Sequence, residues 1–260
     1  MSTDLPTVVL LHGNPETPVV WDPLRAALAR TDSANRTVVT PHLPGFGSPI
    51  PTGFDASKEA YAQWLTSELE AIVERSGPVD VVGHDWGGVL AMRVISQRPE
   101  LVRSWACDVL ELFHADYVWH DFAQIWQKSP AGEDYFAGTL ATAADIRIAM
   151  YENIGIPIET GTLLVAAADQ LMCDCVLRLY RSAIQPAMAV WGEAIDGAAA
   201  RPGLCITAEN DPFVRNHDMA LHVGTRLGAS AKQMAGQGHW WMLGDPDGAA
   251  AMLRTFWAGL

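Results

Sequence analysis

The stretch VDVVGHDWGG, residues 79–88, decides the fold that we expect. Its first residues form a short apolar run, which is typical of a strand buried on both faces of a parallel sheet. Small residues then surround Asp85, and an amphipathic segment at helical spacing follows at 86–97. The glycines permit a strained backbone at this point. We therefore expect a strand that turns sharply into a helix, with Asp85 at the turn.

The same alternation continues on both sides of this stretch. Short apolar runs bounded by Gly or Pro predict further buried strands, at 7–12, 37–42, 101–110 and 204–208, with a weaker one at 230–235. Amphipathic segments between them predict helices, at 18–30, 57–75, 216–227 and 246–258. Strands that alternate with helices in this way predict an α/β fold with a doubly wound, mostly parallel sheet.

The middle of the chain breaks this alternation. From 113 to 191 the pattern is helical, and no convincing strand interrupts it. We predict a core formed by 1–112 and 192–260, with 113–191 inserted as a helical cap. An insertion after a central strand lies over the carboxyl ends of the sheet, where open α/β folds bind ligands. The cap is therefore expected to act as a lid.

Composition and charge limit the partners of the protein. The 260 residues are 49% hydrophobic and 18% charged, which predicts a globular protein with a large core. Seventeen Lys and Arg against thirty Asp and Glu give a net charge of −13, which repels phosphate backbones and anionic lipids. No apolar run approaches the ~20 residues of a membrane span, and the first residues carry no secretion signal. We expect a cytoplasmic protein that binds neither nucleic acid nor membranes.

The four cysteines do not suggest a disulfide framework or a metal site. They lie at 107, 173, 175 and 205 of a long chain, whereas disulfide scaffolds are short and rich in cysteine. Cys173 and Cys175 have no second pair and no His at the spacing of zinc ligands. We expect free thiols and no bound metal.

Further motifs accompany the turn at Asp85. The stretch LLHGNP, 10–15, ends an earlier strand, and GQGHW, 236–240, follows the last one. Together with LPGFG at 43–47 and NDP at 210–212, they resemble the α/β-hydrolase fold, specifically its aspartate-nucleophile branch, which contains haloalkane dehalogenases and epoxide hydrolases. The resemblance covers nearly the whole chain. It implies a hydrolase without a cofactor, whose cap follows the sixth strand of the fold.

The chain departs from this family at its start. The strand that leads to His12 begins almost at the first residue, so the first two strands of the family are expected to be missing. The segment 37–42 would then lie at the edge of a shortened sheet. Because an exposed edge invites pairing with another strand, we predict that the N-terminus or a second subunit of a homodimer covers it.

Chemistry limits what an aspartate nucleophile can attack. A carboxylate is ionised at neutral pH and needs no base to activate it. Attack on a carbonyl would give a mixed anhydride, whereas attack on an sp3 carbon that bears a halide or an epoxide oxygen gives an alkyl ester. The resemblance implies that Asp85 attacks and that His239 activates the water that hydrolyses the ester. The alternative for Asp85 is a helix N-cap.

The acid that orients His239 is, by the resemblance, Asp211, which follows the strand at 204–208. Two alternatives stay open. Glu209 lies on the same segment, and Asp108 follows the sixth strand of the fold, from which one subgroup of dehalogenases takes its acid. The histidines His12 and His84 are expected to support the site structurally.

Halide and epoxide chemistry need different groups around the nucleophile. A leaving halide needs N–H donors, whereas an opening epoxide becomes an alkoxide and needs a proton donor. Asn14 and Trp86, which the motifs place at the oxyanion, offer an amide and an indole N–H, similar to the halide pair of one dehalogenase group. In the cap, Tyr180 and Tyr135 are candidate proton donors for an epoxide.

The cap aromatics predict an apolar pocket. Trp119, Phe122 and Trp126 resemble the opening of a dehalogenase cap helix, and Trp191 is a further candidate ring of the pocket. We therefore expect dehalogenation of a small apolar halide by water, with epoxide opening as the alternative. A protein that keeps the fold and binds ligands without catalysis is a third hypothesis.

Overall fold

The computed structural model describes residues 5–31 and 36–260, and within them the chain forms a parallel sheet of six strands. The strand order is β2-β1-β3-β4-β5-β6, and each neighbouring pair is parallel. The expected α/β fold is confirmed, with every strand near its predicted position. The strands are β1 (Val8–Leu11), β2 (Val38–Val39), β3 (Val79–Gly83), β4 (Val102–Cys107), β5 (Gly203–Ala208) and β6 (Ser230–Met234).

Two strands are shorter than the sequence predicts. At the edge of the sheet, only Val38 and Val39 pair with β1, because Pro41 lacks an N–H and the chain turns away to place the Leu43 N–H on His12 Nε2, 3.1 Å away. β4 stops at Cys107, because Val109 adopts a φ of 48° and a 3-10 helix follows. The predicted cover of the β2 edge involves residues 1–4, which lie outside the described residues, or a second subunit; it stays a prediction.

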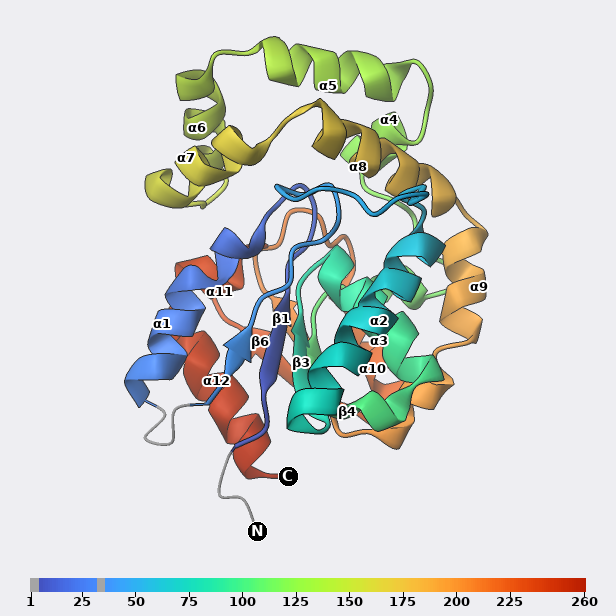
Figure 1. Ribbon diagram of the computed structural model, residues 1–260, viewed down its shortest axis with the longest axis vertical. Helices are drawn as coiled ribbons and strands as arrows, with labels where there is room; N and C mark the ends of the chain where they lie inside the picture. The colour runs from blue at the N-terminus through green and yellow to red at the C-terminus, as the bar shows by residue number, and fades with distance from the viewer. Residues whose placement is uncertain (1–4, 32–35) are drawn as a thin grey trace.

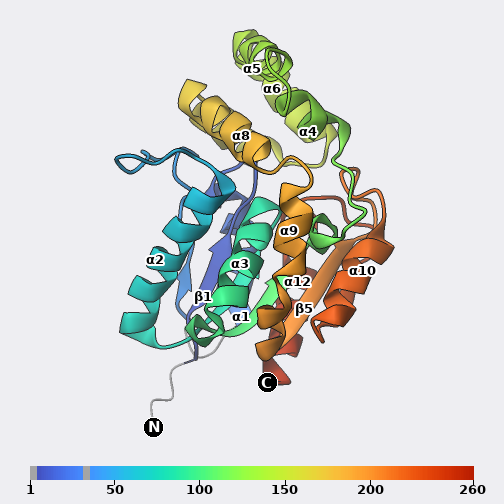
Figure 2. The same cartoon turned by 90° about the vertical axis from the view of Figure 1, so that its right-hand side faces the viewer.

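Helices cover both faces of the sheet, and alternate strand residues divide between two cores (Figures 1 and 2). Val9 and Leu11 pack on the side of α2, α3 and α10, whereas Val8 and Leu10 pack on the side of α1 and α12. This division is what a doubly wound sheet requires. The helices are α1 (Asp22–Thr31), α2 (Lys58–Ser76), α3 (Trp86–Gln97), α10 (His217–Arg226), α11 (Trp241–Gly244) and α12 (Pro246–Ala258).

A buried acid ties the strands together away from the site. Asp80 on β3 is fully buried and accepts hydrogen bonds from Arg103 at 2.8 and 2.7 Å, from Arg36 at 2.9 Å and from Ser104 at 2.6 Å. Because a buried charge is tolerated only when it is paired, these bonds fix β4 and the segment before β2 against β3.

The segment between β4 and β5 is helical, and five of its helices form a cap over the carboxyl ends of the strands (Figure 1). Among the described residues, no strand lies in this segment. The cap helices are α4 (Asp121–Trp126), α5 (Ala131–Ala141), α6 (Ala144–Asn153), α7 (Ile158–Ala167) and α8 (Gln170–Ser182). A sixth helix, α9 (Ala187–Glu193), lies beside the core near α3 (Figure 2). The exact boundaries of core and cap stay a prediction.

The remaining expectations about the chain concern cysteines and membranes. All four cysteines are free and buried, as predicted. Within residues 5–31 and 36–260, no helix has both the length and the apolar character that crossing a membrane requires.

Candidate active site

Asp85 lies on a strained turn between β3 and α3. Its φ of 50° and ψ of −126° are unusual for a residue with a side chain. Glycines allow the turn: a Cβ on Gly87 would lie 2.3 Å from the Leu11 carbonyl oxygen. Asp85 occupies the N-cap position of α3, as the alternative expected, but its side chain forms no capping hydrogen bond with the helix. The carboxylate lies at the helix N-terminus, where the helix dipole favours negative charge.

The surroundings of the Asp85 carboxylate restrain its charge. Its Oδ1 accepts the backbone N–H of Asn14 at 2.9 Å. Burial raises the pKa of Asp85 to about 6, although the positive charges of His239 and His84 oppose the rise. The carboxylate is therefore ionised above pH 6, yet poorly solvated, which suits a nucleophile.

His239 follows β6 and lies between two carboxylates. Its Nε2 is 4.0 Å from Asp85 Oδ2, and its Nδ1 is 2.7 Å from Asp211 Oδ2. Asp211 is held in turn by the Phe213 N–H, which donates to Oδ1 at 2.8 Å. Burial alone would lower the pKa of His239, but the charge of Asp211 outweighs burial and raises it. Conversely, His239 outweighs burial at Asp211 and lowers the pKa of that carboxyl.

The two alternative acids contact other groups. Glu209 accepts the Gly236 N–H at 2.7 Å, which fixes the loop before His239 but leaves the ring itself to Asp211. Asp108 accepts from His84 Nδ1 at 2.5 Å and from the Asp85 N–H at 2.8 Å. Of the three candidates, only Asp211 is brought to His239.

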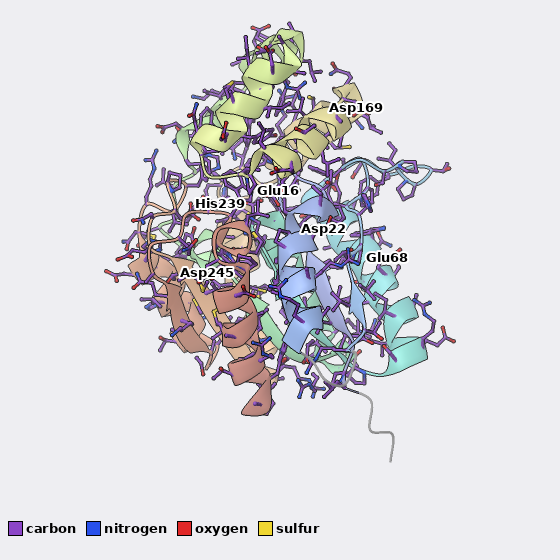
Figure 3. All side chains as sticks on the ribbon, turned by 90° about the vertical axis from the view of Figure 1, so that its left-hand side faces the viewer. Glu16, Asp22, Glu68, Asp169, His239 and Asp245 are labelled. Atoms are coloured by element: carbon purple, nitrogen blue, oxygen red, sulfur yellow. The ribbon has the colours of Figure 1, made fainter. Side chains whose placement is uncertain are left out.

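A buried charge cluster, formed by Glu16, His84 and Asp108, lies directly beneath the site. His84 Nε2 is 3.2 Å from Glu16 Oε1, on the ring edge opposite Asp108. Glu16 Oε2 also accepts the Gly13 N–H at 3.1 Å. Figure 3 labels Glu16 and His239, which both lie just below the cap. The cluster thus connects the segments that follow β1, β3 and β4.

Charge within this cluster is well defined. Burial alone would lower the pKa of His84, but Asp108 and Glu16 raise it well above its usual value, so the ring is an imidazolium. The charge of His84 in turn lowers the pKa of Glu16 to about 2, against the effect of burial. The His84 and His239 rings lie only 4.5 Å apart between centroids, so His84 places a fixed positive charge beside the base.

His12 acts as a structural group, as predicted. It is fully buried, and its Nε2 accepts the Leu43 N–H at 3.1 Å. Burial lowers its pKa to about 4, so the ring is neutral and can accept.

One group of side chains could be mistaken for a metal centre. Ligand atoms of Glu16, His84 and His239 lie within 4.8 Å of one another, the one such group in the described parts of the chain. However, Glu16 already accepts N–H groups of Gly13 and Trp240 with its two oxygens, and His84 is protonated. This donor set fits an ion pair better than a metal ion.

A cavity of about 270 Å³ opens between the cap and the core, lined by Asp85, His239 and Asn14. Five of the predicted cap residues line it as well: Trp119, Phe122, Trp126, Tyr135 and Tyr180. A larger surface hollow of about 810 Å³ between β6 and α12 contains none of the predicted site residues.

Two predicted aromatic residues do not line this cavity. Trp86 is 1% exposed and lies behind Tyr180, with the ring centroids 5.5 Å apart. Its side chain hydrogen-bonds to the Tyr180 hydroxyl, as the Asn14 amide does, and both bonds oppose the rise in the pKa of Tyr180. The role of Trp86 as a donor to the leaving group stays a prediction. Trp191 faces the cations of Lys58 and Arg93 instead, 4.7 and 5.2 Å from its ring.

Tyr180 reaches the centre of the site. Its hydroxyl accepts a hydrogen bond from Asn14 Nδ2 at 3.3 Å. Burial and the neighbouring Asp85 raise the pKa of Tyr180 well above its usual value, so the hydroxyl keeps its proton. Asn14 Oδ1 is buried without a partner among the described residues.

Several residues that line the cavity were missed by sequence reasoning, among them Glu111, Tyr117 and His120. The signal for Glu111 was available, since it is an acid inside the apolar run 109–113. His120 caps α4, its Nδ1 accepting the Ala123 N–H at 3.2 Å, so its proton is on Nε2. Burial lowers the pKa of His120 to about 4, which leaves the ring neutral.

The family model described as the alpha/beta hydrolase family matches residues 8–252. The chain belongs to this family. A haloalkane dehalogenase of Mycolicibacterium paratuberculosis is 28% identical over 231 residues, covering 84% of this chain and 72% of the relative. A second, of Mesorhizobium japonicum, is 25% identical over 177 residues, 68% of this chain and 52% of the relative. Epoxide hydrolase 3 of Siraitia grosvenorii is 32% identical over 102 residues, 38% of this chain and 30% of the relative.

Solved structures agree on the fold. Haloalkane dehalogenase DbeA from Bradyrhizobium elkani superposes with a TM-score of 0.74 at 22% identity, over 100% of this chain and 93% of the other. A putative epoxide hydrolase from Pseudomonas aeruginosa gives 0.74 at 20% identity, over 98% of this chain and 89% of the other. These comparisons place the chain among hydrolases of this group and leave its specific reaction to be argued from the site.

We predict that His84→Gln destabilises the protein by about 3 kcal/mol at pH 8, because two buried carboxylates lose their cation. The loss should shrink at pH 5, because without the His84 cation the buried Glu16 carboxyl has a raised pKa and takes up a proton more readily than in the unfolded chain. Urea unfolding measures both. His222→Gln, at an exposed histidine, is the matched control, and the double variant Glu16→Gln/His84→Gln should recover part of the loss. A single-variant loss below about 1 kcal/mol would contradict the imidazolium.

Proposed function

We propose that this protein hydrolyses a substrate at an sp3 carbon through a covalent ester on Asp85. One observation carries the proposal. Asp85, on a strained turn, presents an ionisable carboxylate to a cavity that His239 also lines, with Nε2 and Oδ2 4.0 Å apart. That separation is too long for a hydrogen bond, so the two groups are free to act in turn on substrate and water.

In the first step, Asp85 Oδ2 attacks the carbon, the bond to the leaving group breaks, and its electron pair departs with the leaving group. The Asp85 charge is thereby consumed and an alkyl ester forms. Oδ1 becomes the carbonyl oxygen of the ester, and the Asn14 N–H, 2.9 Å away in the free protein, is already directed at it.

In the second step, His239 Nε2 takes a proton from water, which attacks the ester carbonyl. Negative charge develops on Oδ1, where the Asn14 N–H stabilises it, and the backbone N–H of Trp86 contributes a second favourable interaction with this carboxyl. Asp211 stabilises the imidazolium that forms on His239. The alcohol then leaves, Asp85 is restored as a carboxylate, and His239 passes its proton to solvent.

Halide displacement is the leading candidate for the reaction. It needs no proton for the leaving group, and the Asn14 amide beside the nucleophile can donate to a halide. The most extensive match among the relatives reported above is a haloalkane dehalogenase, and the cavity wall is rich in aromatic side chains. We propose a small apolar halide and water as the substrates, and the expected cytoplasmic location and homodimer stay predictions.

Epoxide hydrolysis is the second candidate, and Tyr180 favours it. Its protonated hydroxyl lies at the Asn14 amide and lines the cavity with Asp85. Such a hydroxyl can protonate an epoxide oxygen as the ring opens. The Tyr180 hydroxyl occupies the hydrogen bonds of Trp86 and Asn14, the two donors that a halide would use. Tyr135 also lines the cavity and is a further candidate donor.

We predict that His239→Phe accumulates the ester, because attack remains while hydrolysis stops. The variant is incubated separately with a short bromoalkane and with a styrene-oxide-like epoxide, and intact mass and peptide mapping locate the adduct. An adduct on Asp85 from the bromide supports dehalogenation, and one from the epoxide alone makes Tyr180 the ring-opening acid. The control is Asp85→Asn/His239→Phe, which should form none. Failure of both electrophiles would favour the binding-protein hypothesis.

We predict that the rates of the two steps rise with pH at different midpoints. Ester formation needs ionised Asp85, so its single-turnover rate should rise through about pH 6. Ester hydrolysis needs neutral His239, whose pKa is raised above its usual value, so turnover should rise at higher pH than ester formation. In His239→Phe, the loss of the positive charge should shift the first midpoint upward. Coincident midpoints for the two steps, or a downward shift in the variant, would oppose these assignments.

A further inference from the structure

Glu111 is a buried carboxyl in the wall of the active-site cavity that the proposed reaction does not use. It lies in the 3-10 helix Leu110–Phe113, which directly follows β4, and is only 2% exposed. It lines the same cavity as Asp85 and His239. A carboxyl group at such a position is costly unless it is paired.

The structure gives Glu111 no partner of opposite charge, and the hydrogen bond from its own backbone N–H does not offset burial. Its Oε2 is buried without a hydrogen-bond partner among the described residues. The charged groups that act on it are the carboxylates Asp211, Asp108 and Asp85. Burial and these like charges raise the pKa of Glu111 well above its usual value, so the side chain is an uncharged carboxylic acid.

An uncharged carboxylic acid carries an O–H donor, which a carboxylate lacks. In a protein interior nearly every such group is satisfied, and a leucine would fill the same space without an unmet polar atom. Glu111 therefore does not serve the packing of the core. Glu111 lines the cavity, so a bound ligand can supply the hydrogen-bond acceptor that its O–H group lacks within the fold.

A second hydroxyl-bearing side chain from the same segment lines the cavity with Glu111. Tyr117, on the same segment between β4 and α4, is 7% exposed and lines the cavity too. Burial and the proximity of Glu111 raise the pKa of Tyr117, so it also keeps its proton. The cap contributes apolar rings to the same cavity, Phe122, Trp126 and Phe136, together with polar side chains such as Thr139 and Arg147. The cavity thus suits a ligand with an apolar part and an oxygen.

We propose that Glu111 sets the substrate class, donating a hydrogen bond to an uncharged acceptor oxygen of the substrate, with Tyr117 as a second donor. The acceptor is an ether or carbonyl oxygen, and the three carboxylates that act on Glu111 disfavour an anion at that position. The preferred substrate is therefore a small halide or epoxide that also bears such an oxygen, and a plain haloalkane is a poorer substrate of the same site. The identity of the electrophile rests on the function proposed above, whereas the binding of the oxygen does not.

Binding of unreactive alcohols tests this without any chemistry. Heptan-1-ol is compared with three ethers of the same chain length, 2-butoxyethanol, 3-propoxypropan-1-ol and 4-ethoxybutan-1-ol, by calorimetry. In the wild type, at least one ether should bind about tenfold more tightly than heptan-1-ol. Glu111→Leu should abolish this preference, whereas Glu111→Gln, which keeps a donor of the same shape, should retain it.

Equal affinities for all four alcohols in the wild type, or no measurable binding, would overturn the proposal. So would a preference that survives Glu111→Leu, or one that Glu111→Gln loses as completely as Glu111→Leu. Thermal unfolding confirms that each variant is folded. The function proposed above fails independently, if Asp85 is never alkylated. An ether preference without alkylation would keep Glu111 and reject the ester mechanism, and alkylation without an ether preference would do the reverse.

Discussion

The position of His84 between two buried carboxylates is the constraint on which the site depends. Its imidazolium holds Asp108 at 2.5 Å and Glu16 at 3.2 Å. Asp108 accepts a hydrogen bond from the backbone N–H of Asp85, and Glu16 accepts one from the backbone N–H of Gly13, next to Asn14. One buried cation therefore fixes the nucleophile and the N–H that faces it, although they come from different strands. The strained turn at Asp85 can persist because these bonds over-determine it.

The same cluster shapes the electrostatics of the cavity. Asp85 and Glu111 line the cavity and Asp211 contacts His239 in its wall, so like charges close to one another would otherwise suppress ionisation. The positive charge of His84 opposes the rise in the pKa of Asp85 and the rise in the pKa of His239. It therefore favours an ionised nucleophile and a base that is not too readily protonated. Glu111 has no such cation beside it, so its carboxyl group stays protonated and uncharged.

The sequence predicts the frame of the molecule better than the walls of its cavity. Apolar runs bounded by glycine or proline were sufficient to predict the strands, because backbone periodicity determines them. The order of the motifs was sufficient for the turn at Asp85 and the place of His239. Side-chain direction is not readable in this way: Trp86 follows Asp85 directly, yet the first turn of α3 carries it behind Tyr180. Glu16 was missed because its importance lies in contacts between distant segments, whereas Glu111, an acid inside the apolar run 109–113, could have been singled out.

Isotope tracing tests the covalent ester most directly. A single turnover of a short bromoalkane, with the protein in excess, is run in water enriched in oxygen-18. If Asp85 attacks the carbon, the alcohol takes its oxygen from the carboxylate, so the alcohol is unlabelled and the label appears in the peptide that contains Asp85. If water attacks the carbon directly, the alcohol carries the label in the first turnover and the peptide does not, which would contradict the account.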